Sequence, residues 1–282
     1  MNTENHTDRT ALSKERIRQF RTVVYTHFRK RGRTLPWRTD YNPYHILVSE
    51  IMLQQTQVER VSEKFTGFIE RFPAVTDLAE APLSEVLALW QGLGYNRRAK
   101  ALKEAAEMIV NRFDGRVPAT PEELIRLPGI GAATAASITA FAFDKPALFL
   151  ETNIRTVLIH HFFGGKNRID DHELLRVAGM VLDRRNPRKW YSALMDYGTV
   201  LKKEVGNLSR RSVAYKKQTP FEGSRRQVRG AVLRFLLGKK SAGSAVIAEG
   251  TGKKKEVVAE VLEELVDEGI LIKKNRSFRI AG

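Results

Sequence analysis

The chain has 282 residues, a length that suits one large domain or two ordinary ones. Of these residues 42% are hydrophobic and 28% charged, proportions that exclude a largely disordered protein. It carries 48 Lys and Arg against 32 Asp and Glu, a formal net charge of +16, which predicts a polyanionic partner, nucleic acid ahead of an anionic membrane surface. It has no Cys, which excludes disulfides, thiolate catalysis, Cys-ligated zinc and Cys-held iron–sulfur clusters in this chain.

The N-terminal segment is polar and lacks the apolar stretch of a signal peptide. We expect residues 1–13 to form a disordered tail. No apolar run approaches the length of about 18 residues that indicates a transmembrane helix. The sequence therefore predicts a cytoplasmic protein, associated with the nucleoid if it is bacterial, with no membrane partner.

Apolar residues recur at spacings of three and four from Ser13 onward, a pattern typical of amphipathic helices. Gly32 and Pro36 interrupt this pattern, and a further helix is predicted over about 44–56. Short helical stretches separated by Gly and Pro turn signals follow, whereas strand-like alternation is almost absent before residue 270. These features predict an all-α array of short helices over residues 14–200.

The pattern changes in the last third of the chain. Residues 201–224 are predicted to form a basic, Cys-free loop and linker, with Pro220 and Gly223 as turn signals. Three helical stretches and a small β-hairpin around Asn275 follow, the order of a winged-helix domain over residues 225–282. From residue 202 to the end there are 19 basic and 9 acidic side chains, so 10 of the 16 excess positive charges lie there.

The segment LPGIG (127–131) lies between two apolar helical patterns. Gly129 and Gly131 bracket a single residue, which allows a tight hairpin between two helices and leaves backbone N–H groups uncovered. Those groups and the N-terminus of the following helix make a phosphate-binding site. An ordinary Gly-rich turn between helices is the alternative interpretation.

Five motifs occur in order along residues 15–200: LPWR (35–38), SEIMLQQTQV (49–58), QGLGYNRRAKAL (91–102), LPGIG (127–131) and ETNIRTVL (151–158). Together they resemble the helix-hairpin-helix DNA glycosylases of the endonuclease III superfamily, most closely the MutY branch. The resemblance implies an all-α fold of two helical subdomains with a DNA-binding cleft, here followed by the small winged-helix domain. It also implies a monomeric enzyme of base excision repair whose partner is double-stranded DNA with a mismatched or damaged base.

Cleavage of an N-glycosidic bond needs a proton donor for the departing base and an anion near the sugar, and two carboxyl groups with separated pKa values meet both needs. The base must also leave the helical stack to be reached. By resemblance, the proton donor is the Glu of the SE-x-M-L-Q-Q-T motif, which is Glu50. A salt-bridged helix carboxylate is the alternative interpretation.

The second carboxylate departs from the family pattern. Relatives carry Asp where this chain has Glu151, and the extra methylene adds about 1.5 Å of reach. Three outcomes are open: Glu151 stabilises the sugar cation normally, forms a lasting covalent ester, or leaves a weakly catalytic lesion-binding protein. Asn153 in the same motif is expected to hold the loop or contact the DNA backbone.

Bifunctional relatives carry a lyase Lys two residues after the second hairpin glycine, and Ala133 occupies that position here. Because Ala cannot form an imine, we expect a monofunctional, hydrolytic glycosylase. The resemblance assigns DNA contacts to four further residues, for each of which simple surface solvation is the alternative: Gln54, Gln55, Tyr95 and Arg97. The hairpin residues expected to contact DNA are Pro128, Gly129 and Gly131.

Two features of the MutY branch are missing. Without Cys the four-iron cluster of many relatives cannot form, and the residues after about 220 are too few for the Nudix-like domain that recognises 8-oxoguanine. Two interpretations of the substrate therefore stay open: adenine opposite 8-oxoguanine or guanine, and a uracil, thymine or hypoxanthine mismatch. We expect no cofactor, other than a monovalent cation that backbone carbonyls of the hairpin could hold.

The winged-helix domain has a functional interpretation of its own. Basic residues at a helix start and on the wing predict an additional duplex-binding module. A protein-interaction or dimerisation module is the alternative. The residues predicted to contact DNA in this domain are Lys253, Lys254, Lys273 and Arg276.

Overall fold

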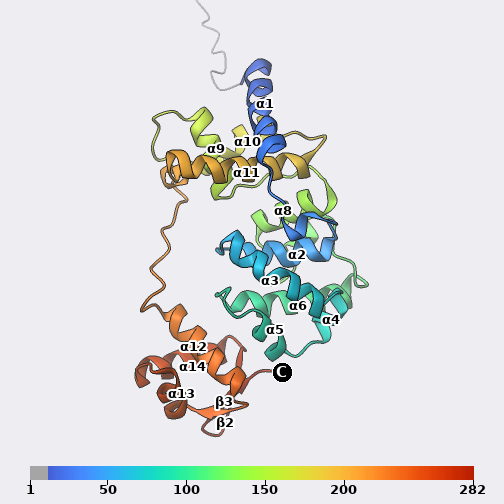
Figure 1. Cartoon of the computed structure of the whole chain (residues 1–282). Helices are drawn as coiled ribbons and strands as arrows, with labels where there is room; N and C mark the ends of the chain where they lie inside the picture. Colours follow the sequence, from blue (N-terminus) through green and yellow to red (C-terminus); the bar gives the residue numbers. More distant parts are fainter. Residues whose placement is uncertain (1–11) are drawn as a thin grey trace, which may run out of the picture. The chain divides into compact units, whose positions relative to one another are not determined.

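The computed structural model describes residues 12–282 and is built almost entirely from helices (Figure 1). Most of the predicted N-terminal tail lies outside the described residues, and helix α1 begins at Lys14 with Ser13 as its N-cap. The chain folds into two compact units, one formed by residues up to Thr34 with Thr139–Lys216, the other by Leu35–Ile138 with Lys217–Gly282. The predicted all-α fold with a small C-terminal winged helix is confirmed.

The first unit packs its helices around a long, amphipathic helix, α11. Trp190 and Tyr191 of this helix are almost fully buried, Trp190 in edge contact with Phe20 and Tyr191 4.2 Å from the Phe149 ring. Gly198 brings α9 and α11 together, because a Cβ there would lie 2.5 Å from the backbone oxygen of Asn153. The elements of this unit are α1 (Lys14–Arg31), α9 (Thr152–Phe162), α10 (Asp171–Val181), α11 (Pro187–Val205) and the 3₁₀ helix η2 (Leu208–Arg211).

The second unit contains a helical part that surrounds α2 and α6. Helix α2 starts at Pro43, where a proline costs no hydrogen bond, and is buried on most sides. The long helix predicted over about 44–56 is thus slightly shorter and ends at Leu53. The elements are the 3₁₀ helix η1 (Pro36–Arg38), α2 (Pro43–Leu53), α3 (Val58–Arg71), α4 (Val75–Glu80), α5 (Leu83–Leu89), α6 (Arg97–Arg112), α7 (Pro121–Leu124) and α8 (Ala132–Phe143), whose last residues belong to the first unit.

The predicted hairpin between helices is present, and α7 and α8 are joined by the LPGIG turn. Gly129 has a φ of +77°, and a Cβ there would lie 2.9 Å from the Cβ of Ala101 on α6. Both the backbone conformation and the close approach of α6 therefore require glycine at this position. Gly131 is different: it is exposed, its φ is not positive, and a Cβ added there would meet no atom within 4 Å.

The C-terminal part of the second unit has the predicted winged-helix order. Its elements are α12 (Arg225–Gly238), β1 (Ala242–Gly243), α13 (Ser244–Thr251), α14 (Lys255–Asp267), β2 (Leu271–Lys274) and β3 (Ser277–Ile280). Asn275 has a φ of +55° in the turn between β2 and β3, as its turn-forming character predicts. The sheet has three antiparallel strands in the order β1-β3-β2, one more than the sequence predicts, because two residues are too few to show a periodic pattern.

Candidate active site

Glu50 lies on the last turn of α2, among buried apolar neighbours that fix the helix in the core. Its carboxylate is half-buried. Oε2 of Glu50 lies 2.5 Å from Oγ of Ser137 on α8, and Ser137 Oγ is also 2.9 Å from the carbonyl oxygen of Thr134. The Ser137 hydroxyl donates to the Glu50 carboxylate. This contact holds the Glu50 side chain against α8 and fixes the orientation of its carboxyl group.

Ser137 is a site residue that the motif comparison missed. It is 3% exposed and lies in a helix otherwise made of Ala, Ile, Thr and Phe. A buried hydroxyl in such an apolar helix requires a hydrogen-bond partner, and this requirement is the only indication of a role that the sequence offers for Ser137. Its partner is 87 residues away in the chain, so sequence alone does not identify it.

The hairpin residues lie beside the end of α2. Gln54, the C-cap of α2, donates from Nε2 to the carbonyl oxygen of Gly129 at 3.1 Å and to Oγ1 of Thr134 at 3.3 Å. The carbonyl of Gly129 is thus engaged by a side-chain amide. Ala133 lies exposed in the first turn of α8. The structure therefore brings Glu50, Gln54 and the LPGIG turn together within one unit.

Gln55 follows directly and has a left-handed backbone, with a φ of +57° and an exposed side chain. A non-glycine residue in this region is strained by about 1 kcal/mol or more, and such strain concentrates at functional positions. Gln55 thus lies in the turn directly after the helix that carries Glu50, with its side chain in solvent. This is the behaviour expected of a residue that contacts a ligand rather than the core.

Glu151 and Asn153 lie in the other compact unit, at the start of α9. Glu151 is the N-cap of this helix, and its Oε1 accepts hydrogen bonds from the backbone N–H groups of Asn153 at 2.8 Å and Ile154 at 3.0 Å. Burial raises the pKa of the Glu151 carboxyl, and the two N–H groups and the charges of Lys202 and Arg155 oppose this only in part. Asn153 has a buried Oδ1 without a hydrogen-bond partner among the described residues.

Tyr95 and Arg97 were predicted to contact DNA, and both lie against the C-terminal part of the chain. The Tyr95 hydroxyl accepts a hydrogen bond from Nη1 of Arg226 at 2.9 Å. Arg97 forms an ion pair with Glu268 at 2.5 Å. The loop before α6 is thus in contact with the winged helix.

Arg98, next to these residues, was not singled out from the sequence. Its buried guanidinium donates to the carbonyl oxygens of Ile51 and Met52, both at 2.8 Å, and to those of Leu93 and Gly94. Burial lowers the pKa of Arg98 to about 10. This side chain joins the loop before α6 to the end of the helix that carries Glu50. The sequence did not indicate that Arg98 is buried, because it follows the exposed Arg97 at the start of a helix.

The four winged-helix residues predicted to contact DNA differ in their surroundings. Lys254 and Arg276 are exposed. Lys273 forms an ion pair with Glu263 at 2.6 Å, and Nζ of Lys253 lies 3.4 Å from Oε1 of Gln227. The structure does not gather these side chains around one point of contact.

The Cys-free segment after α11 is held by hydrogen bonds. The Arg211 guanidinium donates to the carbonyl oxygens of Phe163 and Lys166, and Asp171 accepts from both Arg155 and the hydroxyl of Ser212. Ile169 and Ser212 form an isolated parallel β-bridge. Among residues 12–282, no group of three or more His, Asp or Glu side chains is arranged to hold a metal ion.

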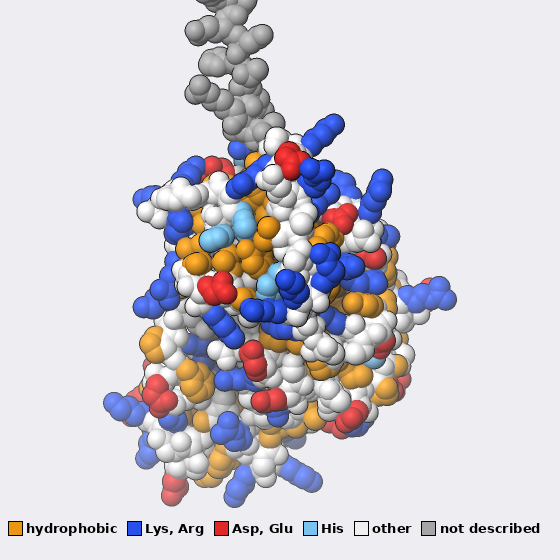
Figure 2. Space-filling model, turned by 45° about the horizontal axis from the view of Figure 1, so that its top comes forward, with side chains coloured by type: hydrophobic (Ala, Val, Ile, Leu, Met, Phe, Trp, Pro, Cys, Tyr) orange, Lys and Arg blue, Asp and Glu red, His pale blue; other side chains and the backbone are white. Residues whose placement is uncertain are grey.

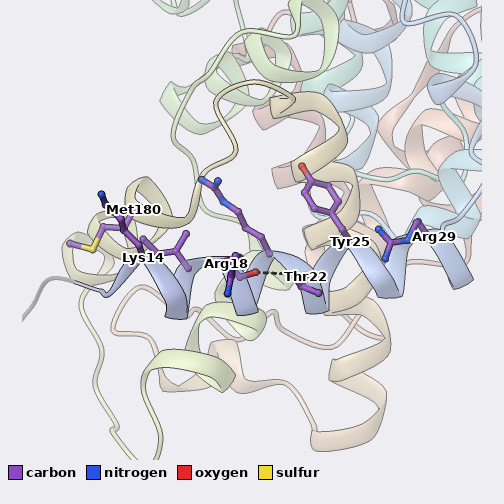
Figure 3. Close-up of a pocket in the computed structure, with 8 residues that line it drawn as sticks. Lys14, Arg18, Thr22, Tyr25, Arg29 and Met180 are labelled. Carbon is purple, nitrogen blue, oxygen red and sulfur yellow. Dashed lines mark hydrogen bonds between the residues drawn. The ribbon is translucent and has the colours of Figure 1, made fainter.

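A shallow hollow of 520 Å³ runs along one side of α1 and is lined by Lys14, Ile17, Arg18, Arg21, Thr22, Tyr25, Arg29 and Met180 (Figure 3). Several of its polar groups are already engaged. Arg21 donates to the carbonyls of Val181 and Leu182, and the Tyr25 hydroxyl donates to Asp183 at 2.6 Å. None of the candidate catalytic residues lines this hollow.

Positive charge is widespread on the surface. Figure 2 shows Lys and Arg side chains over most of the face drawn, with fewer acidic side chains between them. This distribution agrees with the net charge of +16 and with binding of a polyanion. In the described part of the chain, no helix is both long enough and apolar enough to span a bilayer.

Comparisons with known proteins show which family this chain resembles. Residues 48–179, which include Glu50, the hairpin and Glu151, match the model of the HhH-GPD superfamily base excision DNA repair proteins. The chain is 38% identical over 185 residues to an adenine DNA glycosylase of Buchnera aphidicola subsp. Baizongia pistaciae, a match that covers 64% of this chain and 52% of the relative. The chain therefore spans about half the length of that relative.

Two other matches cover most of the length of the matched protein. The thymine/uracil-DNA glycosylase of Methanothermobacter thermautotrophicus is 31% identical over 195 residues, which cover 68% of this chain and 87% of the relative. The solved structure of a thermostable thymine-DNA glycosylase superposes with a TM-score of 0.59 at 29% identity, over 66% of this chain and 87% of that one. The resemblance seen in the motifs is confirmed, and the chain belongs to the HhH-GPD superfamily of base excision DNA repair proteins, on its MutY-like side.

Proposed function

We propose that this protein is a monofunctional DNA glycosylase that flips a mispaired or damaged base out of the duplex and hydrolyses its N-glycosidic bond. The observation that carries the proposal is the hydrogen bond that Ser137 donates to Glu50, which orients a half-buried carboxyl group close to the hairpin. Family membership supports the same chemistry.

Each carboxylate has a separate task in this mechanism. Glu50 donates its proton to the departing base, which makes the base a better leaving group. Glu151 supplies negative charge to the sugar as positive charge develops there, and water completes the hydrolysis. The Asn153 and Ile154 N–H groups fix one carboxylate oxygen of Glu151 and leave the other for this role.

The hairpin binds the DNA backbone in this proposal. Neither the backbone conformation nor the packing at position 131 requires glycine. A phosphate that approaches the backbone closely would require it, because a side chain there would obstruct the phosphate. The exposed N-terminus of α8 and the high positive charge supply the attraction. Gln55, on its strained turn, fills the space that the flipped base leaves.

The adenine DNA glycosylase relatives support adenine as the first candidate base, and we propose adenine opposite 8-oxoguanine or guanine as the substrate. Uracil or thymine mismatches are the second candidate, because the thymine/uracil-DNA glycosylase relative is matched over 87% of its length. Hypoxanthine removal and lesion binding without cleavage are the remaining alternatives.

A single-turnover assay on a panel of duplexes distinguishes these substrates. The panel pairs adenine with 8-oxoguanine, adenine with guanine, uracil with guanine, thymine with guanine, and hypoxanthine with thymine. We expect strand scission after alkali on one or two of them, and none with Glu50→Gln, which retains binding. Binding without product on every duplex would leave the lesion-binding alternative, and a denaturation-resistant protein–DNA band that Glu151→Gln abolishes would indicate a covalent ester.

The absence of lyase chemistry has its own test. Ala133 is exposed in the first turn of α8, where a lysine side chain would be unobstructed. We expect the wild-type protein to form no adduct with abasic DNA that borohydride can trap, and Ala133→Lys to form one. A trapped adduct in the wild-type protein would show that another amine performs lyase chemistry.

A further inference from the structure

We propose that the winged helix acts as a positioning module for the loop before α6, through Arg226 and Glu268. The winged helix would then hold Tyr95 and Arg97 in place for contact with DNA. This inference rests on the proposed function and on the expectation that Tyr95 and Arg97 in that loop contact DNA.

Helix α14 has the wrong charge to enter a DNA groove along its length. It is the second helix of the α13–α14 pair, the position that reads bases in helix-turn-helix proteins. Between Lys255 and Glu268 it carries six acidic side chains against one basic one: Glu256, Glu260, Glu263, Glu264, Asp267 and Glu268. Phosphates would repel this surface.

The acidic side chains are instead paired within the protein. Arg225 on α12 forms ion pairs with Glu260 at 2.9 Å and with Glu264 at 2.5 Å, and Arg229 bonds to both Glu264 and Glu268. Acidic residues at the C-terminal end of a helix are disfavoured by its dipole, so these carboxylates depend on the arginines for stabilisation.

Glu268 extends this network to the helical part of the same unit. Its side chain is 13% exposed and accepts from Arg97 as well as Arg229. Burial opposes ionisation of Glu268, yet the hydrogen bonds from the two arginines outweigh it and keep the pKa of this carboxyl below its ordinary range. At the adjacent Gly269, a Cβ would lie 3.3 Å from Cε of Lys100 on α6. The end of α14 is therefore docked against the start of α6.

Tyr95 is in contact with two arginines. Their guanidinium groups lie over its ring, that of Arg98 at 5.5 Å and that of Arg226 at 5.2 Å from the ring centroid. Arg226 also donates to the Tyr95 hydroxyl, as does the side-chain amide of Gln218. Tyr95 has a φ of +49°, a strained conformation that persists only where its surroundings enforce it. Arg226 and Gln218, both from the C-terminal segment, provide part of that enforcement.

The contacts continue toward Glu50. Arg98, whose guanidinium also lies over the Tyr95 ring, donates to the carbonyl oxygens of Ile51 and Met52 at the end of α2. The winged helix thus reaches the end of the catalytic helix through Tyr95 and Arg98. Arg226 and Glu268 are accordingly positioning residues rather than catalytic ones.

The test compares full-length variants, Arg226→Met and Glu268→Gln, with Arg234→Met as a control on the exposed side of α12. Hydrogen exchange of the peptide spanning residues 91–98 is measured first, in the free protein. We expect about tenfold faster exchange in both variants and no change in the control. Unchanged exchange in Arg226→Met and Glu268→Gln would overturn the proposal.

Duplex binding and cleavage provide the second measurement. A positioning role predicts that Arg226→Met lowers affinity for the target duplex and the single-turnover rate about tenfold, with an unchanged salt dependence of binding. A direct phosphate contact would instead reduce the slope of log K against log salt by about 0.9, and that result would overturn the proposal. In a Tyr95→Leu background, Arg226→Met should have less than about a twofold further effect, because both act through one side chain.

The two proposals fail separately. If the wild-type protein cleaves no duplex while exchange at residues 91–98 responds as expected, the glycosylase function fails and the docking of the loop stands. If the wild-type protein cleaves and the loop does not respond, only the positioning role fails.

Discussion

Ser137 on α8 places its hydroxyl oxygen 2.5 Å from Oε2 of Glu50 on α2. The contact connects the helix that follows the hairpin to the carboxyl group assigned to protonate the departing base. A hydrogen bond donated to a charged carboxylate contributes about 1.5–3 kcal/mol. This one also fixes the rotamer of Glu50 relative to the LPGIG turn.

Ser137→Ala should therefore slow single-turnover cleavage by about 10- to 100-fold while duplex affinity stays within about twofold. The rate falls because Glu50 loses the hydroxyl that orients its carboxyl group. Ser192→Ala is the matched control: Ser192 is equally buried, and its hydroxyl has no partner among the described residues. A wild-type rate for Ser137→Ala would show that Glu50 is oriented without it.

Glu151→Gln should stabilise the fold while it abolishes cleavage. Burial raises the pKa of Glu151 above its ordinary value of 4.5, so the folded state favours the protonated form and loses stability as the pH rises and the group ionises. A neutral Gln retains an oxygen for the Asn153 and Ile154 N–H groups and avoids that loss. We expect a higher unfolding midpoint for the variant at pH 7, with the difference shrinking toward pH 4. A midpoint below the wild type at pH 7 would contradict this reasoning.

The two hairpin glycines should respond differently to alanine. Gly129→Ala places a Cβ 2.9 Å from the Cβ of Ala101 at a φ of +77°, so we expect a loss of about 1–3 kcal/mol in the free energy of unfolding. Gly131→Ala meets no atom within 4 Å and should leave stability within about 0.5 kcal/mol.

Duplex binding separates the roles of these glycines. Gly131→Ala should weaken affinity for DNA about tenfold or more, because the new methyl group obstructs the approach of a phosphate to the backbone. The measurement is a binding titration beside urea unfolding of the same samples. Full affinity with Gly131→Ala would remove the phosphate-binding role from that position.

Arg98→Met should cost about 3 kcal/mol or more of unfolding free energy. The substitution leaves carbonyl oxygens at the end of α2 and in the loop before α6 without their donor. Arg97→Met is the control from the adjacent position; its side chain is 72% exposed, and we expect a loss within about 1 kcal/mol. Equal losses in the two variants would contradict a structural role specific to Arg98.

Much of the local structure could be predicted from sequence, because it depends on neighbours in the chain. The hairpin follows from the conformational freedom of Gly129, and the wing from the turn at Asn275. The three helical stretches predicted for the C-terminal part from apolar periodicity are present as α12, α13 and α14. The two-residue strand β1 was missed because its pairing with β3 depends on residues 34–36 positions away.

The site was predicted only where a motif carried it. Glu50, Gln54 and the LPGIG turn lie together in the structure. The sequence did not predict that Tyr95 contacts Arg226 or that Arg97 pairs with Glu268. Sequence alone does not distinguish an arginine that is free in solvent from one that pairs with a residue distant in the chain.

The sequence by itself determined the family, the helical fold, the winged-helix order and the absence of any Cys that could hold an iron–sulfur cluster. These depend on composition, on short-range periodicity and on motifs that are contiguous in the chain. Only the tertiary structure decided that Ser137 meets Glu50, that Arg98 is buried at the end of α2, and that the acidic side of α14 is paired internally. Each of these joins residues distant in the chain, and their hydrogen bonds and ion pairs exist only after folding has excluded water from between the elements that carry them.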